Sequence, residues 1–272
     1  MEELLKLDEI CKKVRRDIIL QIGMLGVGHA GGSLSVVELL VVLYKKYMRV
    51  DPKNPKKAGR DRLFVSKGHS GPAVYAVLCD MGFFDHSWLE TLNKPGTRLP
   101  SHCDMNLTPG IDMTTGSLGQ GLSCAIGACL GSRLNEDHAK IYSILGDGEL
   151  QEGQIWEAAM FASHQKLSNL MVFIDYNKAQ IDGLVSDVCG IEPLALKWRA
   201  FGWDVLEVRD GNSCSEIDAT ISGAIKSEKP CAVILNTIKG FGVSFVEELE
   251  VENHSMYITN EQMKEAVKEL GF

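Results

Sequence analysis

The chain has 272 residues, 45% of them hydrophobic, and its 36 acidic and 28 basic side chains give a net charge of −8. A chain of this length buries roughly three quarters of its unfolded surface, so it needs no disulfide or metal to fold. The acidic balance speaks against non-specific binding to nucleic acid, and no apolar run approaches the roughly 18 residues of a membrane-spanning helix.

Apolar residues at three- and four-residue steps predict an amphipathic helix over residues 7–22, and a nearly all-apolar stretch predicts a buried helix over residues 36–47. Four short, branched-rich runs predict strands at 141–145, 170–174, 205–208 and 232–235. Amphipathic stretches at 153–166, 192–201 and 213–227 lie between them. This alternation predicts an α/β fold, a doubly wound and mostly parallel sheet with helices on both faces, in one domain spanning residues 1–272.

The cysteines, the N-terminus and the charged stretches indicate the cellular environment and the surface of the protein. The eight cysteines form no Cys-x-x-Cys pair and no zinc-like cluster, and the charged N-terminus lacks the apolar core of a signal peptide. We therefore expect reduced, buried thiols in a soluble cytoplasmic protein without membrane contact. A basic stretch from Lys45 to Lys67 and an acidic stretch from Glu247 to Glu269 stand out, and we interpret both as solvated faces.

The strongest motif begins directly after the strand predicted at 141–145. Gly146-Asp147-Gly148 follows that strand, and Asn177 stands thirty residues after Asp147, behind the next predicted strand. Adjacent parallel strands bring such residues to one edge of the sheet, where a doubly wound fold binds its ligand. The glycines allow close approach of a phosphate to a helix amino end, and the Asp and Asn oxygens suit Mg²⁺.

The stretches GDGELQEGQIWEA and YNKAQIDG resemble the thiamine diphosphate motif, and they are similar to transketolases in particular. The resemblance implies a thiamine diphosphate-binding fold with Mg²⁺, or Ca²⁺ or Mn²⁺ in its place, as the metal. It implies these metal ligands: Asp147 and Asn177 by side chain, and Ala179 by its carbonyl. It implies these cofactor contacts: Gly146, Gly148 (against the diphosphate), Ile181 (against the thiazolium ring) and Glu152, an acid at the family's subunit interface.

Four histidines stand in frames that resemble the same family: His29 in GHAGGSLS, His69 in SKGHSGPA, His102 in LPSHCDM and His254 after KGFGVSF. The resemblance implies that His29, His69 and His102 line the channel and hydrogen-bond the sugar donor, and that His254 lies near the diphosphate. Groups that titrate near neutrality suit the proton transfers around carbon–carbon cleavage. Two frames depart from the family, since Ser101-His102-Cys103 replaces Gly-His-Pro and Asn253-His254-Ser255 replaces Trp-His-Gly.

The segment TTGSLGQGLS resembles the family's cofactor-contacting segment, and Gly116 and Leu118 are its implied contacts. In fused transketolases two further domains follow, and one supplies a glutamate that acts on the cofactor's aminopyrimidine. We therefore expect a split enzyme that transfers a two-carbon ketol unit from a ketose phosphate, or a related ketose, to an aldose. We expect it to be active only with a separate C-terminal subunit, in an α2β2 heterotetramer.

Other interpretations remain open at this point. The α subunit of a 2-oxo-acid dehydrogenase shares the diphosphate motif, but the histidines and TTGSLGQG speak against it. A deoxyxylulose phosphate synthase is a second relative, usually a fused chain. A non-catalytic cofactor-binding module is a third possibility, against which the intact Asp147 and Asn177 pair speaks. The pattern Gly26-x-Gly28-x-x-Gly31 matches a dinucleotide motif but follows a predicted helix, where that motif should follow a strand.

Overall fold

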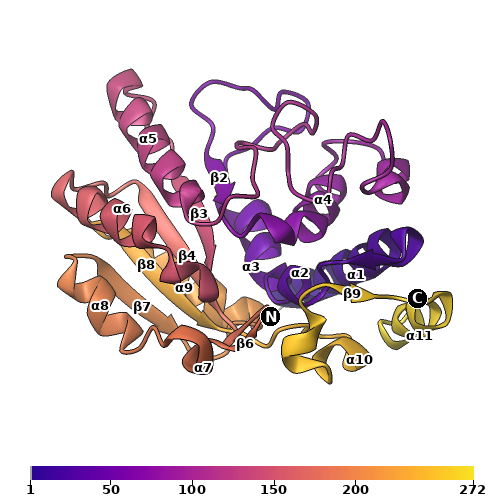
Figure 1. Ribbon diagram of the computed structural model, residues 1–272. Helices are drawn as coiled ribbons and strands as arrows, with labels where there is room; N and C mark the ends of the chain where they lie inside the picture. The colour runs from indigo at the N-terminus through magenta and orange to yellow at the C-terminus, as the bar shows by residue number, and fades with distance from the viewer. Residues whose placement is uncertain (1) are drawn as a thin grey trace.

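A parallel five-stranded sheet forms the centre of the molecule (Figure 1). The computed structural model describes residues 2–272. The strands are β2 (Arg62–Val65), β3 (Ile141–Gly146), β4 (Leu170–Tyr176), β7 (Asp204–Val208) and β8 (Cys231–Asn236), in the order β2-β3-β4-β8-β7. Because each neighbouring pair is parallel, the carboxyl ends of the strands lie along one edge.

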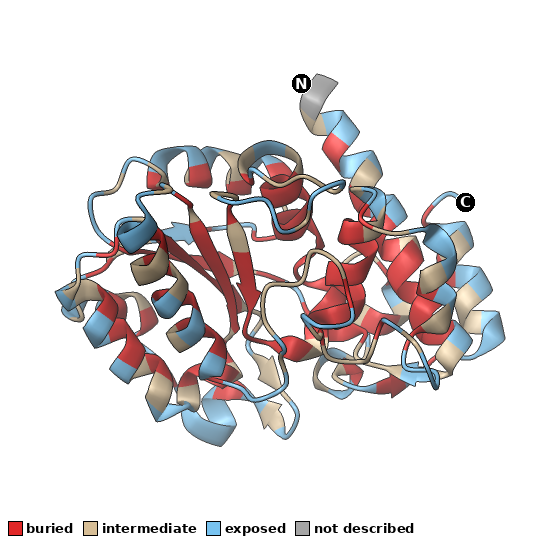
Figure 2. Cartoon of the chain, turned by 90° about the horizontal axis from the view of Figure 1, so that it is seen from above, coloured by how far each residue is buried: buried red, intermediate tan, exposed pale blue. Residues whose placement is uncertain are grey.

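Helices cover both faces of this sheet. One face packs against α1 (Glu2–Leu25), α3 (Val37–Val42), α4 (Gly71–Asp80) and α9 (Cys214–Ala224). The other packs against α5 (Gln120–Asn135), α6 (Gly153–His164) and α8 (Leu194–Ala200). Alternate residues of β4 point to opposite faces of the sheet. Phe173 packs in the hydrophobic core on the α1 side, and Val172 and Ile174 pack in the core on the α5 side. Figure 2 shows the buried residues in the strands and the inward helix surfaces.

Shorter elements complete the chain. The helices are α2 (Gly31–Leu34), α7 (Val185–Cys189), α10 (Ser244–Glu247) and α11 (Asn260–Glu269), with a π-helical turn η1 (Leu43–Tyr47) and 3₁₀ turns η2 (Gly68–Ser70), η3 (His86–Thr91), η4 (Gly148–Gln151) and η5 (Glu250–Asn253). Two antiparallel pairs join β1 (Val27–Gly28) to β9 (Met256–Tyr257) and β5 (Ala179–Gln180) to β6 (Gly183–Leu184). The first pair ties the loop before α2 to the C-terminal segment.

The architecture confirms the predicted fold class and the four predicted strands, within one or two residues at each end. The sheet also contains β2, which the sequence patterns did not predict. The buried helix expected at 36–47 is α3 continued by η1. The expectation of buried thiols is wrong at Cys124 and Cys189, which are exposed, and at Cys79, which is only partly buried, although all eight cysteines are free. None of the helices among residues 2–272 is both long and apolar enough to cross a bilayer.

Candidate active site

A cavity of about 450 Å³ opens at the carboxyl edge of the sheet. Asp147 follows β3 directly, Asn177 follows β4, and the segments after β2 and β8 reach the same place. The cavity lining includes every site residue predicted from the sequence: His29, His69, His102, Gly116, Leu118, Gly146, Asp147, Gly148, Glu152, Asn177, Ala179, Ile181 and His254. Segments that are far apart in the sequence therefore meet at one site.

Backbone N–H groups hold the side chains of Asp147 and Asn177 in place. Asp147 Oδ1 accepts from the N–H of Gly148 at 2.8 Å, and its Oδ2 accepts from the N–H of Lys178. Asn177 Oδ1 accepts from the N–H of Ala179 at 3.1 Å. Burial, followed by the negative charge of Asp175, raises the pKa of Asp147 to about 7. A cation beside this carboxylate would oppose both effects.

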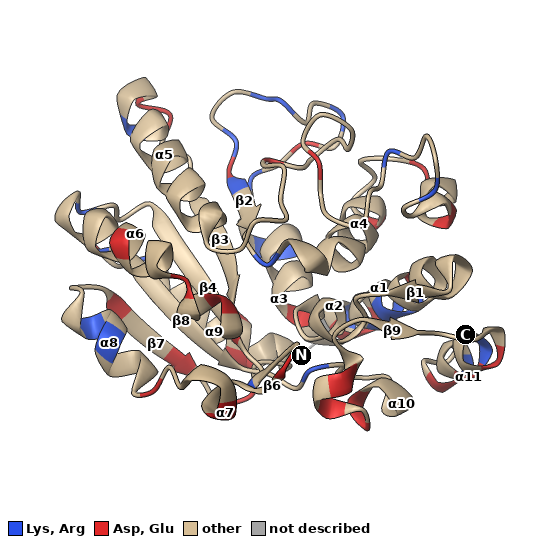
Figure 3. Cartoon of the chain, viewed as in Figure 1, with Lys and Arg blue, Asp and Glu red and all other residues tan. Residues whose placement is uncertain are grey.

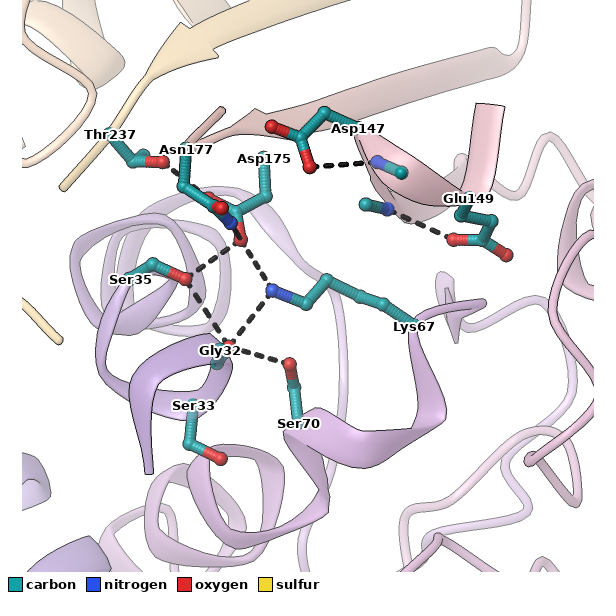
Figure 4. A network of polar contacts seen from close by, with 12 residues as sticks. Gly32, Ser33, Ser35, Lys67, Ser70, Asp147, Glu149, Asp175, Asn177 and Thr237 are labelled. Carbon is teal, nitrogen blue, oxygen red and sulfur yellow. Dashed lines mark hydrogen bonds and ion pairs between the residues drawn. The ribbon is translucent and has the colours of Figure 1, made fainter. Parts of the chain in front are cut away.

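Asp175 and Lys67 form a buried ion pair, and Lys67 also lines the cavity (Figure 4). Asp175 Oδ2 also accepts from Ser35 Oγ at 2.7 Å and from Asn177 Nδ2 at 2.9 Å, and Lys67 Nζ donates to the carbonyl of Gly32 at 2.9 Å. Burial alone would raise the pKa of the Asp175 carboxyl, but the Lys67 ammonium holds it below its usual value. This pair fixes the Asn177 amide, so that its oxygen stays directed away from Asp175.

Glu149 is a second buried carboxylate. It links the segment after β2, the loop before α5 and the end of β3. It accepts from Ser66 Oγ after β2, from the N–H of Gly119 at 2.8 Å and from the N–H of Gly146 at 2.9 Å. The segments pack closely there, because a Cβ on Gly121 would lie 2.5 Å from the Ser66 side chain. Burial raises the pKa of Glu149, and its hydrogen bonds act against that rise. The carboxylate thus holds the Gly116–Leu118 loop against the Gly146 turn.

Lys239 places an unpaired ammonium group in the cavity. Its side chain is 5% exposed, and Nζ has no hydrogen-bond partner among residues 2–272. Burial, followed by the nearby Lys67 charge, lowers the pKa of Lys239 to about 8. A buried ammonium without a partner is costly, and an anionic ligand in this cavity would supply the missing partner.

Four half-buried imidazoles lie together in the cavity lining, and we call this group the mouth. The ring centroid of His29 lies 5.6 Å from that of His69, 5.5 Å from that of His102 and 5.4 Å from that of His254. Burial is the main cause that lowers the pKa of each of the four, and for His254 it does so to about 3, helped by Lys239. All four rings are therefore neutral at pH 7 and able to accept a proton or a hydrogen bond.

The family model for the transketolase thiamine diphosphate-binding domain matches residues 8–272. The chain belongs to the transketolase family. The 6-deoxy-6-sulfo-D-fructose transketolase subunit SqwG of Clostridium sp. (strain MSTE9) is 51% identical over 99% of this chain and 98% of its own length. An apulose-4-phosphate transketolase subunit of Actinobacillus succinogenes is 37% identical over 97% of this chain and 96% of its own.

Solved transketolase structures share this fold. A transketolase variant from Pichia stipitis superposes with a TM-score of 0.92 at 29% identity, over 98% of this chain and 41% of the other. Transketolase from Campylobacter jejuni gives a TM-score of 0.90 at 30% identity, over 98% of this chain and 43% of its own length. The chain thus spans about two fifths of these solved transketolases.

Sequence patterns alone did not identify four charged residues at this cavity: Lys67, Glu149, Asp175 and Lys239. Three of them stand in the family-like motifs SKGHSGPA, GDGELQEG and KGFGVSF. The fourth, Asp175, is a charged residue at the end of an otherwise apolar strand, and such a position is a usable signal, because a buried charge needs a partner.

Proposed function

We propose that this chain is the cofactor- and metal-binding subunit of a split transketolase. It would transfer a two-carbon ketol unit from a ketose to an aldose together with a second chain. The observation that carries the proposal is that Asp147, Asn177 and four neutral histidines line one cavity. A fold that only bound the cofactor would not require four imidazoles at its mouth, so this arrangement favours catalysis over a binding module.

The residues present fit a divalent cation and a diphosphate. Residues 2–272 contain no cluster of three His, Cys, Asp or Glu side chains that could hold a metal. We propose that a metal here would be held by Asp147 with the amide oxygen of Asn177 and the carbonyl of Ala179, leaving positions for phosphate oxygens and water, as Mg²⁺ prefers. The unpaired Lys239 ammonium and the Gly146–Gly148 turn would face the diphosphate.

Thiamine diphosphate, when bound, supplies the carbon nucleophile and the electron sink for carbon–carbon cleavage. This chain's own part is to orient the sugar and to move protons. A neutral imidazole can accept the proton of the donor hydroxyl at the carbon where the bond breaks, and return a proton to the carbonyl oxygen of the acceptor. Lowered histidine pKa values keep these rings in the accepting form at neutral pH.

The apolar side of the cavity supports a separate partner chain. Leu118 is 39% exposed and Ile181 is 69% exposed at the cavity rim, and relatives of about this length are named as subunits. The proposed partner is a C-terminal transketolase subunit, in an α2β2 assembly. It would cover the Gly116–Leu118 loop in an interface well above roughly 2,000 Å², as in obligate complexes.

The donor is proposed to carry an anionic group at the end distant from the ketol unit. The two relatives are named for a sulfonated fructose and for a sugar phosphate, and a solved transketolase of the same fold is described as a complex with sedoheptulose 7-phosphate. Because the donors differ in this anionic end, they would be distinguished there, and the shared ketol end would meet the four histidines.

A turnover screen tests this function. The chain is co-expressed with its partner and supplied with thiamine diphosphate and Mg²⁺, and ketol transfer to an aldose is measured for donors that end in phosphate, sulfonate or a neutral hydroxymethyl group. We expect turnover with at least one anionic donor and its loss in EDTA. Cofactor binding without ketol transfer from any donor would contradict the proposal and favour a binding module.

A further inference from the structure

The basic stretch between Lys45 and Lys67 separates into two groups in the folded chain. Five ion pairs hold the first group: Lys45–Asp80, Lys46–Asp218, Arg49–Asp61, Arg60–Asp112 and Lys67–Asp175. The side chains of Lys53, Lys56, Lys57 and Arg62 have no carboxylate oxygen within 4.0 Å among residues 2–272. A uniformly solvated face would not sort its charges in this way.

The unpaired group lines a cleft that we call the basic cleft. It has a volume of about 860 Å³ and lies between residues 53–62 and residues 105–112, with Arg98 at its border. Arg98 is also without a carboxylate partner in the described part of the chain, and its guanidinium lies 5.0 Å from the Trp88 ring centroid. Figure 3 shows Lys and Arg gathered on the loops beside β2.

Asp112 is the one carboxylate in the lining of the basic cleft, as far as residues 2–272 show, and it is already engaged. It pairs with Arg60 and accepts from the N–H of Leu63 at 2.9 Å. Six basic side chains and this one committed acid therefore line the cleft, with Asp137 near Arg62 outside the lining, in a chain whose net charge is −8. A lining with this excess of positive charge is electrostatically complementary to an anion.

The chemistry of the lining narrows the choice of anion. Guanidinium groups bind phosphates in a two-point geometry, and lysines contribute point charges. A second wall is apolar, because Met105 is 51% exposed and Leu107 is 43% exposed in the same cleft. The cleft volume lies within the roughly 300–1,000 Å³ of small-molecule sites.

We propose that the basic cleft binds a small organic molecule that carries two or more phosphate groups, with a less polar part against Met105 and Leu107. A nucleoside diphosphate is the simplest molecule of this class. The site is separate from the active cavity, since the two share no lining residue among residues 2–272. The connection between them is the segment 98–112, which forms one wall of the cleft and also carries His102.

Binding of ADP tests this proposal. Isothermal titration at 0.15 M salt compares the full chain with Lys56→Glu/Lys57→Glu and with Lys264→Glu/Lys268→Glu, a matched charge change on exposed lysines of α11. We expect a dissociation constant below about 1 mM, weakened about tenfold or more in the cleft variant alone. Hydrogen exchange should show ADP-dependent protection of residues 53–62 and 105–112.

Three outcomes would overturn the proposal. The first is no saturable ADP binding by the unmodified chain, and the second is an equal loss of affinity in both variants, which would indicate general electrostatics. The third is binding of a short single-stranded DNA without binding of ADP, which would point to a polymer. Circular dichroism shows whether each variant folds, and because Lys56 and Lys57 are exposed, both variants should retain the native spectrum.

Discussion

Two groups of residues at the active cavity differ in how far their polar groups are already hydrogen-bonded. We call Asp147, Glu149, Asp175 and Asn177 the floor, and the four histidines the mouth. At the floor, Asp175, Asn177 and Glu149 are engaged by hydrogen bonds from their own chain. At the mouth, the rings of His29, His69 and His254 have no hydrogen-bond partner among residues 2–272, whereas His102 Nδ1 lies 3.2 Å from Ser101 Oγ. Apart from the unpaired Lys239 ammonium, the floor is therefore held by its own chain before any ligand arrives, whereas these three rings keep hydrogen-bonding capacity that we propose the sugar uses.

Because of this difference, substitutions in the two regions should impair different properties of the enzyme. A substitution at the floor removes a preformed contact and should weaken cofactor and metal binding. A substitution at the mouth removes a group that we propose acts on the sugar, and it should lower turnover while binding persists. Variants of the two regions should therefore separate affinity from turnover.

The largest effect is expected for Asp147→Ala and Asn177→Ala. Each removes a proposed oxygen ligand of the metal at the strand ends, so metal-dependent cofactor affinity should fall by more than about a hundredfold while the fold is retained. The measurement is cofactor titration with and without EDTA. Asp182→Ala is the matched control, because Asp182 lines the same cavity outside the strand-end pair. Wild-type affinity that does not depend on metal, in either variant, would refute the metal assignment.

At the mouth, His29→Ala and His69→Ala should each lower kcat by roughly 10²-fold, the usual contribution of a positioned acid–base group. Cofactor affinity should change little, because the floor is intact. Steady-state kinetics and cofactor titration on the same preparations separate the two effects. His164→Ala, on the exposed surface of α6, is the control. Rates within a few-fold of the unmodified enzyme would make these histidines structural and would remove the contrast.

Glu149→Gln examines the floor without touching a metal ligand. The amide cannot accept all the bonds that the carboxylate accepts from Ser66, Gly119 and Gly146. We expect about tenfold weaker cofactor binding, in line with the roughly 1–3 kcal/mol lost when a buried polar group goes unsatisfied. Hydrogen exchange of residues 116–121 should quicken, and kcat at saturating cofactor should stay near its original value. A fall in kcat alone would place Glu149 in catalysis.

The smallest effect concerns the pH dependence of stability. Burial lowers the pKa of His254 from 6.5 to about 3. Below pH 6.5 the unfolded chain therefore binds a proton that the folded chain does not, so this contribution to stability is complete above pH 6.5 and is lost as the pH falls toward 3. The melting temperature should drop between pH 7 and pH 5, and His254→Asn should reduce that drop. An identical pH dependence in His254→Asn and His164→Asn would contradict this.

Local sequence signals predicted part of this structure and not the rest. Strands β3, β4, β7 and β8 were predicted because each contains a short apolar run, whereas β2 is four residues long and begins with Arg62. The residues of the GDG and YNKAQIDG stretches lie where they were predicted, because their spacing follows from two adjacent parallel strands. The Lys67–Asp175 pair joins two residues that are 108 positions apart in the sequence, and no local sequence pattern predicts such a contact.

The most direct test of the central claim is ketol transfer by the 272-residue chain alone and with its partner, from a ketose phosphate to an aldose phosphate with thiamine diphosphate and Mg²⁺. The claim is that this chain supplies the diphosphate floor and the histidine mouth, and that a second chain must supply the groups that act on the pyrimidine end of the cofactor. We predict no turnover by the chain alone and robust turnover once the partner is added. Robust turnover by the chain alone would contradict the account.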